Sequence, residues 1–137
     1  MKKPKILFHG SSHKIRNYLK PRKPADRTFK YNSQNGVYAT DRFGCAIGIS
    51  LAGKQRVFVK NYISRNFKII FIEKPPIKVK RFIYEVSSEG FKESPKGSHQ
   101  WFSKARVKIL KTHIYSTEQL RKYWRMATKE EKKRYGN

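Results

Sequence analysis

Short apolar segments separated by turn-forming residues constrain the fold of this chain more than any other feature. Between residues 56 and 115 the sequence reads "RVFVKNYI", "FKIIFIE", "IKVKRFIYEV" and "WFSKARVKILKTHIY", all rich in β-branched and aromatic residues. Such segments are typical of strands, and the prolines of "KPP" separate two of them because proline cannot donate a ladder hydrogen bond. We therefore predict one mostly antiparallel sheet.

Two further strands and a helix are predicted in the first half of the chain. "KILFH" (5–9) and "GVYAT" (36–40) indicate strands, joined by a mostly irregular segment with one helical turn near "SHKIRNYL". A helix is expected over 42–53, with Asp41 as its N-cap and Gly53 at its end. Its predicted buried face, at three- and four-residue spacing, consists of Phe43, Ala46, Ile47, Ser50 and Leu51.

The last segment, "STEQLRKYWRMATKEEKKRYGN" (116–137), predicts a closing helix. Ser116 followed by Gln119 resembles a capping box. The apolar stripe that we expect to contact the core consists of Leu120, Tyr123, Trp124 and Ala127. Few helices beside a dominant sheet indicate an α+β fold, and a length of 137 residues predicts a single domain over 1–137.

The charge balance is the most unusual property of the composition. The chain has 33 Lys and Arg against 9 Asp and Glu, a formal net charge of +24. Because the basic residues are spread along the whole chain, a folded basic face is favoured over a basic tail. Such a face attracts polyanions and predicts an encounter with nucleic acid. The alternative is that the charge only keeps the protein in solution. In either case, electrostatic repulsion between copies of so basic a chain favours a monomer.

Several classes of protein do not fit the sequence. No apolar run approaches the roughly 18 residues of a membrane span, so no membrane partner is expected. The basic N-terminus lacks the apolar segment of a secretory signal. The single cysteine, Cys45, excludes an internal disulfide and favours a reducing, cytoplasmic setting. We expect Cys45 to be a small buried residue, and the four scattered histidines predict no metal.

Three segments in order resemble the ADP-ribosyltransferase superfamily. These are "LFHGS", then "GVYATD" followed at once by a helix, then "FIYEVSSEGFKESP", a strand that ends in an acidic loop. The likeness extends from about residue 6 to about residue 125. It is to the branch with a His-Tyr-acid triad, including the small rifamycin-modifying and the polymerase-type enzymes. The resemblance implies a split antiparallel sheet, and transfer of ADP-ribose from NAD with release of nicotinamide.

The resemblance also implies roles for matching residues. His9 would bond a hydroxyl of the nicotinamide ribose, and Gly10 would offer its main chain to the nicotinamide carboxamide. Tyr38 would lay its ring against nicotinamide, while Ser11 would contact the ribose or close the turn. Arg42, or Arg22, would hold the NAD phosphates, because a diphosphate suits a guanidinium fork. The structural alternatives are a turn histidine at 9 and a core aromatic at 38.

The third member of the triad stays open between several residues. Glu93 matches the acidic position of the rifamycin-modifying enzymes when one residue is gapped, and Glu85 and Glu89 are rivals. In the polymerase-type enzymes the acid begins a later strand, where this chain offers Gln100 and Ser103 instead. Glu93 has its own structural alternative, a solvated loop charge. His99 and Trp101 have two interpretations, as structural filler or as acceptor-binding residues.

The acceptor of ADP-ribose is not specified by these motifs. The charge suggests nucleic acid, or a protein associated with nucleic acid. Two alternatives remain on the same fold. One is a basic nucleic-acid-binding protein without catalysis, and the other is an NAD-dependent RNA 2'-phosphotransferase. A catalytic protein would bring His9, Tyr38 and a carboxylate into one cleft, whereas a binding protein has no reason to do so.

Overall fold

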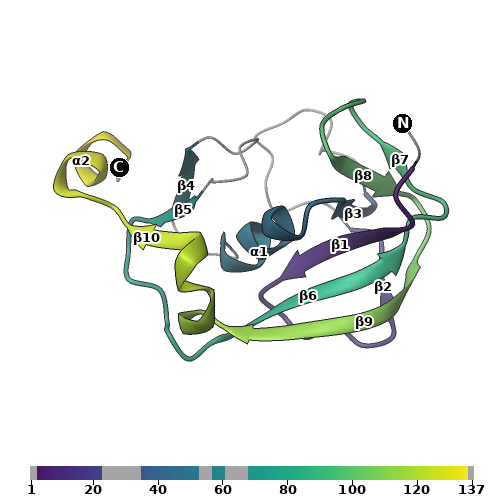
Figure 1. Ribbon diagram of the computed structural model, residues 1–137, viewed down its shortest axis with the longest axis horizontal. Coiled ribbons are helices and arrows are strands. Elements are labelled where there is room, and N and C mark those ends of the chain that lie inside the picture. Colours follow the sequence, from purple (N-terminus) through teal and green to yellow (C-terminus); the bar gives the residue numbers. More distant parts are fainter. Residues whose placement is uncertain (1–2, 23–34, 53–56, 61–67, 136–137) are drawn as a thin grey trace. The chain divides into compact units, whose positions relative to one another are not determined.

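Two β-sheets and three short helices make up the described part of the chain in the computed structural model (Figure 1). The structure describes residues 3–22, 35–52, 57–60 and 68–135. Seven strands form the first sheet, in the order β2 (Tyr18–Leu19), β9 (Val107–Ser116), β6 (Lys80–Ser87), β1 (Ile6–Ser11), β3 (Val37–Thr40), β8 (Gln100–Ser103) and β7 (Lys92–Glu93). Three form the second, in the order β10 (Trp124–Met126), β5 (Lys68–Phe71) and β4 (Val57–Lys60). The helices are α1 (Phe43–Ala52), the 3-10 helix η2 (Glu118–Tyr123) and α2 (Lys129–Tyr135).

Neighbouring strands run mostly antiparallel. Strand β3 pairs antiparallel with β1 and with β8, and β8 does so with β7. The pairs β2–β9 and β4–β5 are also antiparallel, whereas β10 runs parallel to β5. Few helices and mostly antiparallel strands confirm the α+β class. The prediction of a single sheet is wrong, because β4 and β5 pair with each other and with β10 in a sheet of their own.

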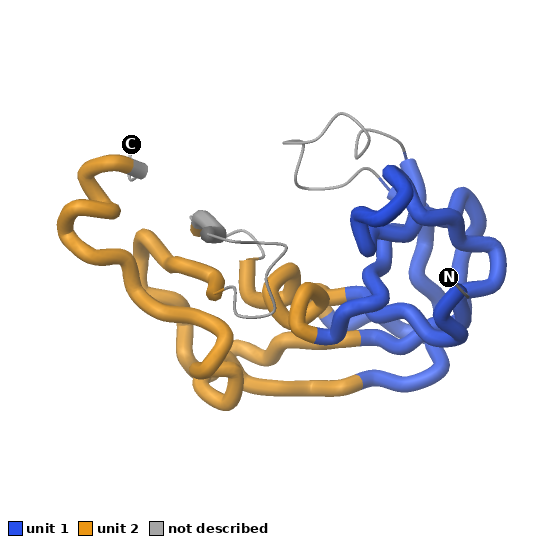
Figure 2. Tube along the Cα trace, turned by 45° about the horizontal axis from the view of Figure 1, so that its top comes forward, with its two compact units in different colours: residues 1–9, 14–43, 84–112 blue, residues 10–13, 44–83, 113–137 orange. Residues whose placement is uncertain are grey.

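The described chain divides into two compact units, coloured separately in Figure 2. Unit 1 comprises residues 1–9, 14–43 and 84–112, and unit 2 comprises residues 10–13, 44–83 and 113–137. Each unit has its own buried apolar residues. In unit 1 these include Leu7, Leu19, Val37, Tyr84, Val86 and Phe91. In unit 2 they include Ala46, Ile47, Leu51, Ile69, Phe71 and Leu120.

Two predicted segments differ locally from the structure. Residues 104–106 interrupt the single strand expected over 101–115, so β8 and β9 are separate strands in the same sheet. The helical turn expected near "SHKIRNYL" is wrong, because Tyr18 and Leu19 are extended and pair with β9. Gly53, the expected end of the first helix, lies outside the described residues, and so do positions 61–63 of the strand expected at "RVFVKNYI".

Helix α1 buries most of the face that its spacing predicts. Ala46, Ile47, Ser50 and Leu51 are buried, and Phe43 is half-buried with its ring edge against Phe8. Because Gly10 has no side chain, the main chain of β1 at this residue can pack directly against α1 in unit 2. A Cβ at Gly10 would overlap the main-chain oxygen of Ala46 and lie 2.9 Å from the main-chain nitrogen of Ser50. Only glycine fits at this position.

The predicted closing helix is wrong, because the chain breaks into η2, β10 and α2. The predicted capping box is confirmed: the Ser116 amide donates to the Gln119 side-chain oxygen at 2.8 Å, and the Gln119 amide to Ser116 Oγ at 3.1 Å. After η2, Trp124 becomes extended and pairs with Ile69 of β5. Its indole donates to the Thr117 main-chain oxygen at 2.9 Å, which stabilises this conformation.

A second capping box starts α2. The Thr128 amide donates to the Glu131 carboxylate at 2.9 Å, and the Glu131 amide donates to Thr128 Oγ1 at 3.2 Å. The guanidinium of Arg125 forks onto the same carboxylate at 2.7 and 2.8 Å. One buried glutamate therefore ties the end of β10 to the start of α2.

Candidate functional site

His9 is held by the main chain of the neighbouring strand. Its ring Nδ1 lies 2.6 Å from the main-chain oxygen of Tyr38. A carbonyl only accepts hydrogen bonds, so Nδ1 carries the proton and Nε2 carries the lone pair. Burial lowers the pKa of His9, and the charge of Arg22 lowers it further, against the opposing effect of the bond to Tyr38. The neutral ring therefore presents Nε2 as a hydrogen-bond acceptor at neutral pH.

The strand register separates the side chains of His9 and Tyr38. Phe8 of β1 pairs with Thr40 of β3, so these two side chains share one face of the sheet. Because side chains alternate along a strand, Tyr38 lies on the face of Thr40 whereas His9 lies on the opposite face. The structure brings the His9 ring to the main chain of Tyr38, not to its phenol.

The side chains around these two rings follow the same division. The Tyr38 ring contacts Phe102 of β8, with centroids 5.0 Å apart. The His9 ring instead lies 6.3 Å from the ring of Tyr84 in β6. Tyr84 is fully buried, and its hydroxyl accepts a hydrogen bond from the Ile15 amide at 2.6 Å. Tyr84 thus supports His9 from the strand on its other side.

Tyr84 is the neighbour of His9 that sequence reasoning missed. The segment "FIYEV" attracts attention for its glutamate, but the alternation of β6 places Glu85 on the face opposite to Tyr84. The available signal was period two in the sequence of the strand: the apolar and aromatic residues Phe82, Tyr84 and Val86 share one face, whereas the other face carries Arg81 and Glu85.

Gly10 and Ser11, the next two residues of β1, have structural roles in unit 2. The close packing of Gly10 against α1 accounts for a glycine there without any ligand. Ser11 is buried, and its Oγ accepts a hydrogen bond from the His13 amide at 3.0 Å. Ser11 therefore closes the turn after β1, which is one of the two roles proposed for it. Contact of either residue with NAD stays a prediction.

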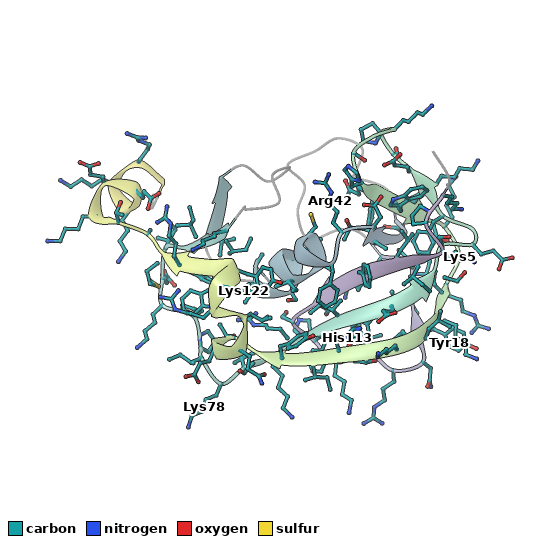
Figure 3. The ribbon with its side chains drawn as sticks, in the orientation of Figure 1. Lys5, Tyr18, Arg42, Lys78, His113 and Lys122 are labelled. Carbon is teal, nitrogen blue, oxygen red and sulfur yellow. The ribbon has the colours of Figure 1, made fainter. Side chains whose placement is uncertain are left out.

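A second polar cluster gathers at the far end of β3. The carboxylate of Asp41 accepts one hydrogen bond from His99 Nδ1 at 2.9 Å and another from the indole of Trp101 at 3.0 Å. The guanidinium Nη2 of Arg42 lies 3.0 Å from His99 Nε2. Hydrogen bonds therefore connect Asp41 through His99 to Arg42. Of these three residues, Figure 3 labels Arg42. These carboxylate contacts replace the predicted N-cap role of Asp41.

Glu93 belongs to this second cluster. Its carboxylate accepts a hydrogen bond from the His99 amide at 3.0 Å. Main-chain hydrogen bonding, first from Gly97 and then from His99, holds the pKa of Glu93 below its ordinary value. His99 itself has a φ of 63°, in the left-handed region that non-glycine residues seldom occupy. The Glu93 carboxylate thus stabilises a strained turn between β7 and β8.

Asp41, Glu93 and His99 offer ligand atoms that lie within 4.8 Å of one another. Their hydrogen bonds argue against a cation at this point. His99 Nδ1 donates to Asp41, and its Nε2 faces the positively charged guanidinium of Arg42. A metal ion would have to break one of these contacts and sit beside that charge.

The candidates for the third triad residue lie at different places in the sheet. Ala39 pairs with Trp101, and Trp101 pairs with Glu93, so Glu93 is on the face of His9 but three strands away, about 14 Å at the usual strand spacing. Gln100 pairs with Thr40, on the face of Tyr38. Ser103 Oγ forms hydrogen bonds with the main chain of Ala105, and the side chain of Glu89 is exposed to solvent. The structure does not bring His9, Tyr38 and Glu93 together.

Comparisons with known proteins leave the family of this chain open. No protein-family model matches the chain, and neither the curated proteins nor the solved structures give a match. Within the described residues, no helix is long and apolar enough to cross a membrane.

Proposed function

We propose that this protein transfers ADP-ribose from NAD to an acceptor and releases nicotinamide, on an ADP-ribosyltransferase-like split sheet. The observation that carries the proposal is the fixed tautomer of His9. Its Nδ1 proton is committed to the Tyr38 main-chain oxygen at 2.6 Å, so Nε2 is the acceptor that a ribose hydroxyl requires. A lowered pKa keeps this nitrogen unprotonated at neutral pH.

The reaction breaks the bond between C1′ of the ribose and the nicotinamide nitrogen. The bonding electron pair leaves with nicotinamide, which neutralises its pyridinium charge. A bond then forms between C1′ and the acceptor nucleophile, whose proton passes to solvent. His9 would orient the ribose through its hydroxyl, and Tyr38, whose ring lies on the opposite face of the sheet, would act through the main-chain oxygen that orients His9. The positive charge that develops on the ribose needs a nearby oxygen acceptor.

We propose that Glu93 supplies negative charge from a distance, because it shares the sheet face of His9 and stays ionised; three strands, about 14 Å, separate the two, so Glu93 acts through its electric field and does not contact the ribose. Arg42 would serve the diphosphate, and its guanidinium is already oriented by His99. The acceptor of ADP-ribose is a nucleic acid, or a protein associated with nucleic acid, as a net charge of +24 favours.

A second candidate is a basic nucleic-acid-binding protein without catalysis. The separation of Glu93 from His9 by three strands favours it, since a triad that works on one bond must converge. This candidate needs no role for the His9 tautomer.

The deciding experiment follows nicotinamide release from NAD by the full chain, with and without added RNA, DNA and protein extract. We expect release that depends on one acceptor class and that is lost in His9→Ala. His13→Ala is the matched control, because His13 is an exposed histidine four positions along the chain. Absence of both nicotinamide release and NAD binding under every condition would overturn the proposal in favour of the binding protein.

A further inference from the structure

The segment that leads into β2 and the adjoining part of β9 border a shallow hollow of about 450 Å³ in unit 1. Residues 14–17 and 109–112 line it, and we call it the β2–β9 hollow. It is open to solvent, and Lys14, Arg16 and Lys111 at its rim are all exposed. It lies outside both polar clusters described above.

The charge around this hollow has one sign. Residues 10–22 and 94–117, which supply β2, β9 and their flanks, contain no aspartate or glutamate. Exposed Lys20, Arg106 and Lys108 add to the three cations at the rim. On the next strand, β6, the carboxylate is that of Glu85, which is half-buried. A polyanion at the hollow therefore meets several cations with little opposing charge.

An aromatic ring adjoins the cations. Tyr18 is 36% exposed, and the guanidinium carbon of Arg106 lies 4.5 Å from its ring centroid. Tyr18 pairs with Lys108, so alternation along β9 puts Leu110, which is 54% exposed, on the same face. Tyr18 is labelled on β2 in Figure 3. An exposed ring beside cations offers a base both a stacking surface and neutralisation of its phosphate.

We propose that the β2–β9 hollow and Tyr18 bind single-stranded nucleic acid along this edge of the sheet. Phosphates would lie on Lys14, Arg16 and Lys111, which line the hollow, and a base on Tyr18, on the face of β9 opposite to Lys111. A single strand is favoured over a duplex because a ring can stack only on a base that has left its own helix. Binding here requires neither NAD nor His9, so this inference can stand or fall separately from the proposed transferase.

The test measures the affinity of the full chain for fluorescein-labelled dT20 and rU20 by fluorescence anisotropy, without NAD. The variant Lys14→Gln/Arg16→Gln/Lys111→Gln is compared with the control Lys74→Gln/Lys78→Gln/Lys132→Gln. All three control lysines are exposed residues of unit 2, and Lys78 is labelled in Figure 3. Both variants lower the formal net charge from +24 to +21, so general attraction falls equally.

We expect the hollow variant to lose at least about tenfold in affinity and the control less than about threefold. The slope of log K against log salt should also fall by about two in the hollow variant, because each phosphate contact on a single strand contributes about 0.7. Equal losses in the two variants would overturn the proposal. The dT20 and rU20 arms distinguish DNA from RNA as the preferred strand.

The ring is tested with Tyr18→Leu against Tyr18→Phe, which differ in stacking but not in apolar character. Leu should weaken binding about tenfold, whereas Phe should bind like the wild type. Equal affinities would remove Tyr18 from the site. A duplex of mixed sequence should bind more weakly than dT20, and tighter duplex binding would contradict the single-strand assignment. Vesicles with phosphatidylserine complete the set, and selective loss of vesicle binding in the hollow variant would assign the surface to lipid instead.

Discussion

The imidazole of His9 takes its orientation from the main chain of Tyr38, through a bond of 2.6 Å to the carbonyl oxygen. Substitutions of the Tyr38 side chain therefore leave this bond possible. Under the proposed reaction, His9→Ala should lower NAD turnover about 100-fold, since it removes the group that positions the ribose. Tyr38→Ala should lower turnover much less, because alanine keeps the main-chain oxygen that orients His9. Tyr38→Phe should stay within a few-fold of the wild type, because both ring and carbonyl remain. Nicotinamide release measures all three, and full turnover in His9→Ala would remove the assigned site.

The environment of His9 also makes folding stability depend on pH. Burial lowers the pKa of His9 below 6.5, so the unfolded chain binds a proton at higher pH than the folded chain does. The free energy of unfolding should therefore fall as the pH drops below 6.5, by at most about 1.4 kcal/mol per pH unit for one proton. Urea denaturation between pH 7.5 and about 5 measures this dependence. His9→Gln should flatten it, and an unchanged slope in that variant would contradict the lowered pKa of His9.

Glu93 should affect folding stability at a lower pH than His9 does. Main-chain hydrogen bonds hold its pKa below 4.5, so its stabilising effect is complete above that pH and disappears as the pH falls through the folded-state value. Glu93→Gln should therefore remove stability that the wild type has at neutral pH and retain the His9-dependent slope. If Glu93 also supplies the negative charge proposed for the reaction, Glu93→Gln lowers NAD turnover. The double variant Glu93→Gln/Gln100→Glu should not restore it. Restored turnover in the double variant would assign the acidic position to residue 100.

Gly10 should tolerate no side chain, because a Cβ would overlap the main-chain oxygen of Ala46, a backbone atom that cannot rotate away. We expect Gly10→Ala to cost about 3 kcal/mol or more of unfolding free energy, through displacement of α1 from β1. Gly90→Ala is the control: its φ of 83° is strained for alanine, but the added Cβ would lie 4.0 Å from Ser103 Oγ, an ordinary van der Waals contact. It should cost only about 1 kcal/mol. Similar costs would mean that helix packing does not explain the glycine at 10.

The carboxylate of Glu131 should contribute substantially to folding stability, although it lies near the end of the described chain. It accepts hydrogen bonds from both guanidinium nitrogens of Arg125 and from the Thr128 amide. Glu131→Ala should lower the free energy of unfolding by about 2 kcal/mol, whereas Glu131→Gln keeps the cap and should lose about half of that. Exposed Glu130 gives the matched control, and Glu130→Ala should change stability by less than about 0.5 kcal/mol.

Local patterns predicted local structure well. The period of residues 43–51 predicts the buried face of α1, and Ser116 with Gln119 predicts a capping box that forms. These features depend on contacts between residues three or four positions apart, which the sequence specifies directly. The C-terminal segment failed because its stripe of Leu120 and Trp124 is compatible with a helix, whereas pairing of Trp124 with Ile69 stabilises a strand. That partner lies 55 positions earlier, and no local pattern identifies it.

The candidate site was harder to predict for the same reason. Sequence order indicates that His9 and Tyr38 lie on adjacent strands, but the face of each side chain depends on a register set by one pairing, Phe8 with Thr40. The chain from Asp41 to His99 and Arg42 joins residues more than 50 positions apart and was not predicted. Neither Asp41 nor His99 belongs to a recognisable spacing, so only the fold brings them together.

Each compact unit draws on three separate stretches of the sequence, and this arrangement affects how the protein is made. Unit 1 needs residues 84–112, and unit 2 needs residues 113–137. During synthesis on a ribosome, neither set of contacts can be complete until most of the chain has emerged. An early strand such as β2 must wait for β9, which is made much later, and meanwhile its apolar residues depend on protection from aggregation. The same interleaving means that exchange of a contiguous segment that crosses one of these boundaries would alter both units at once.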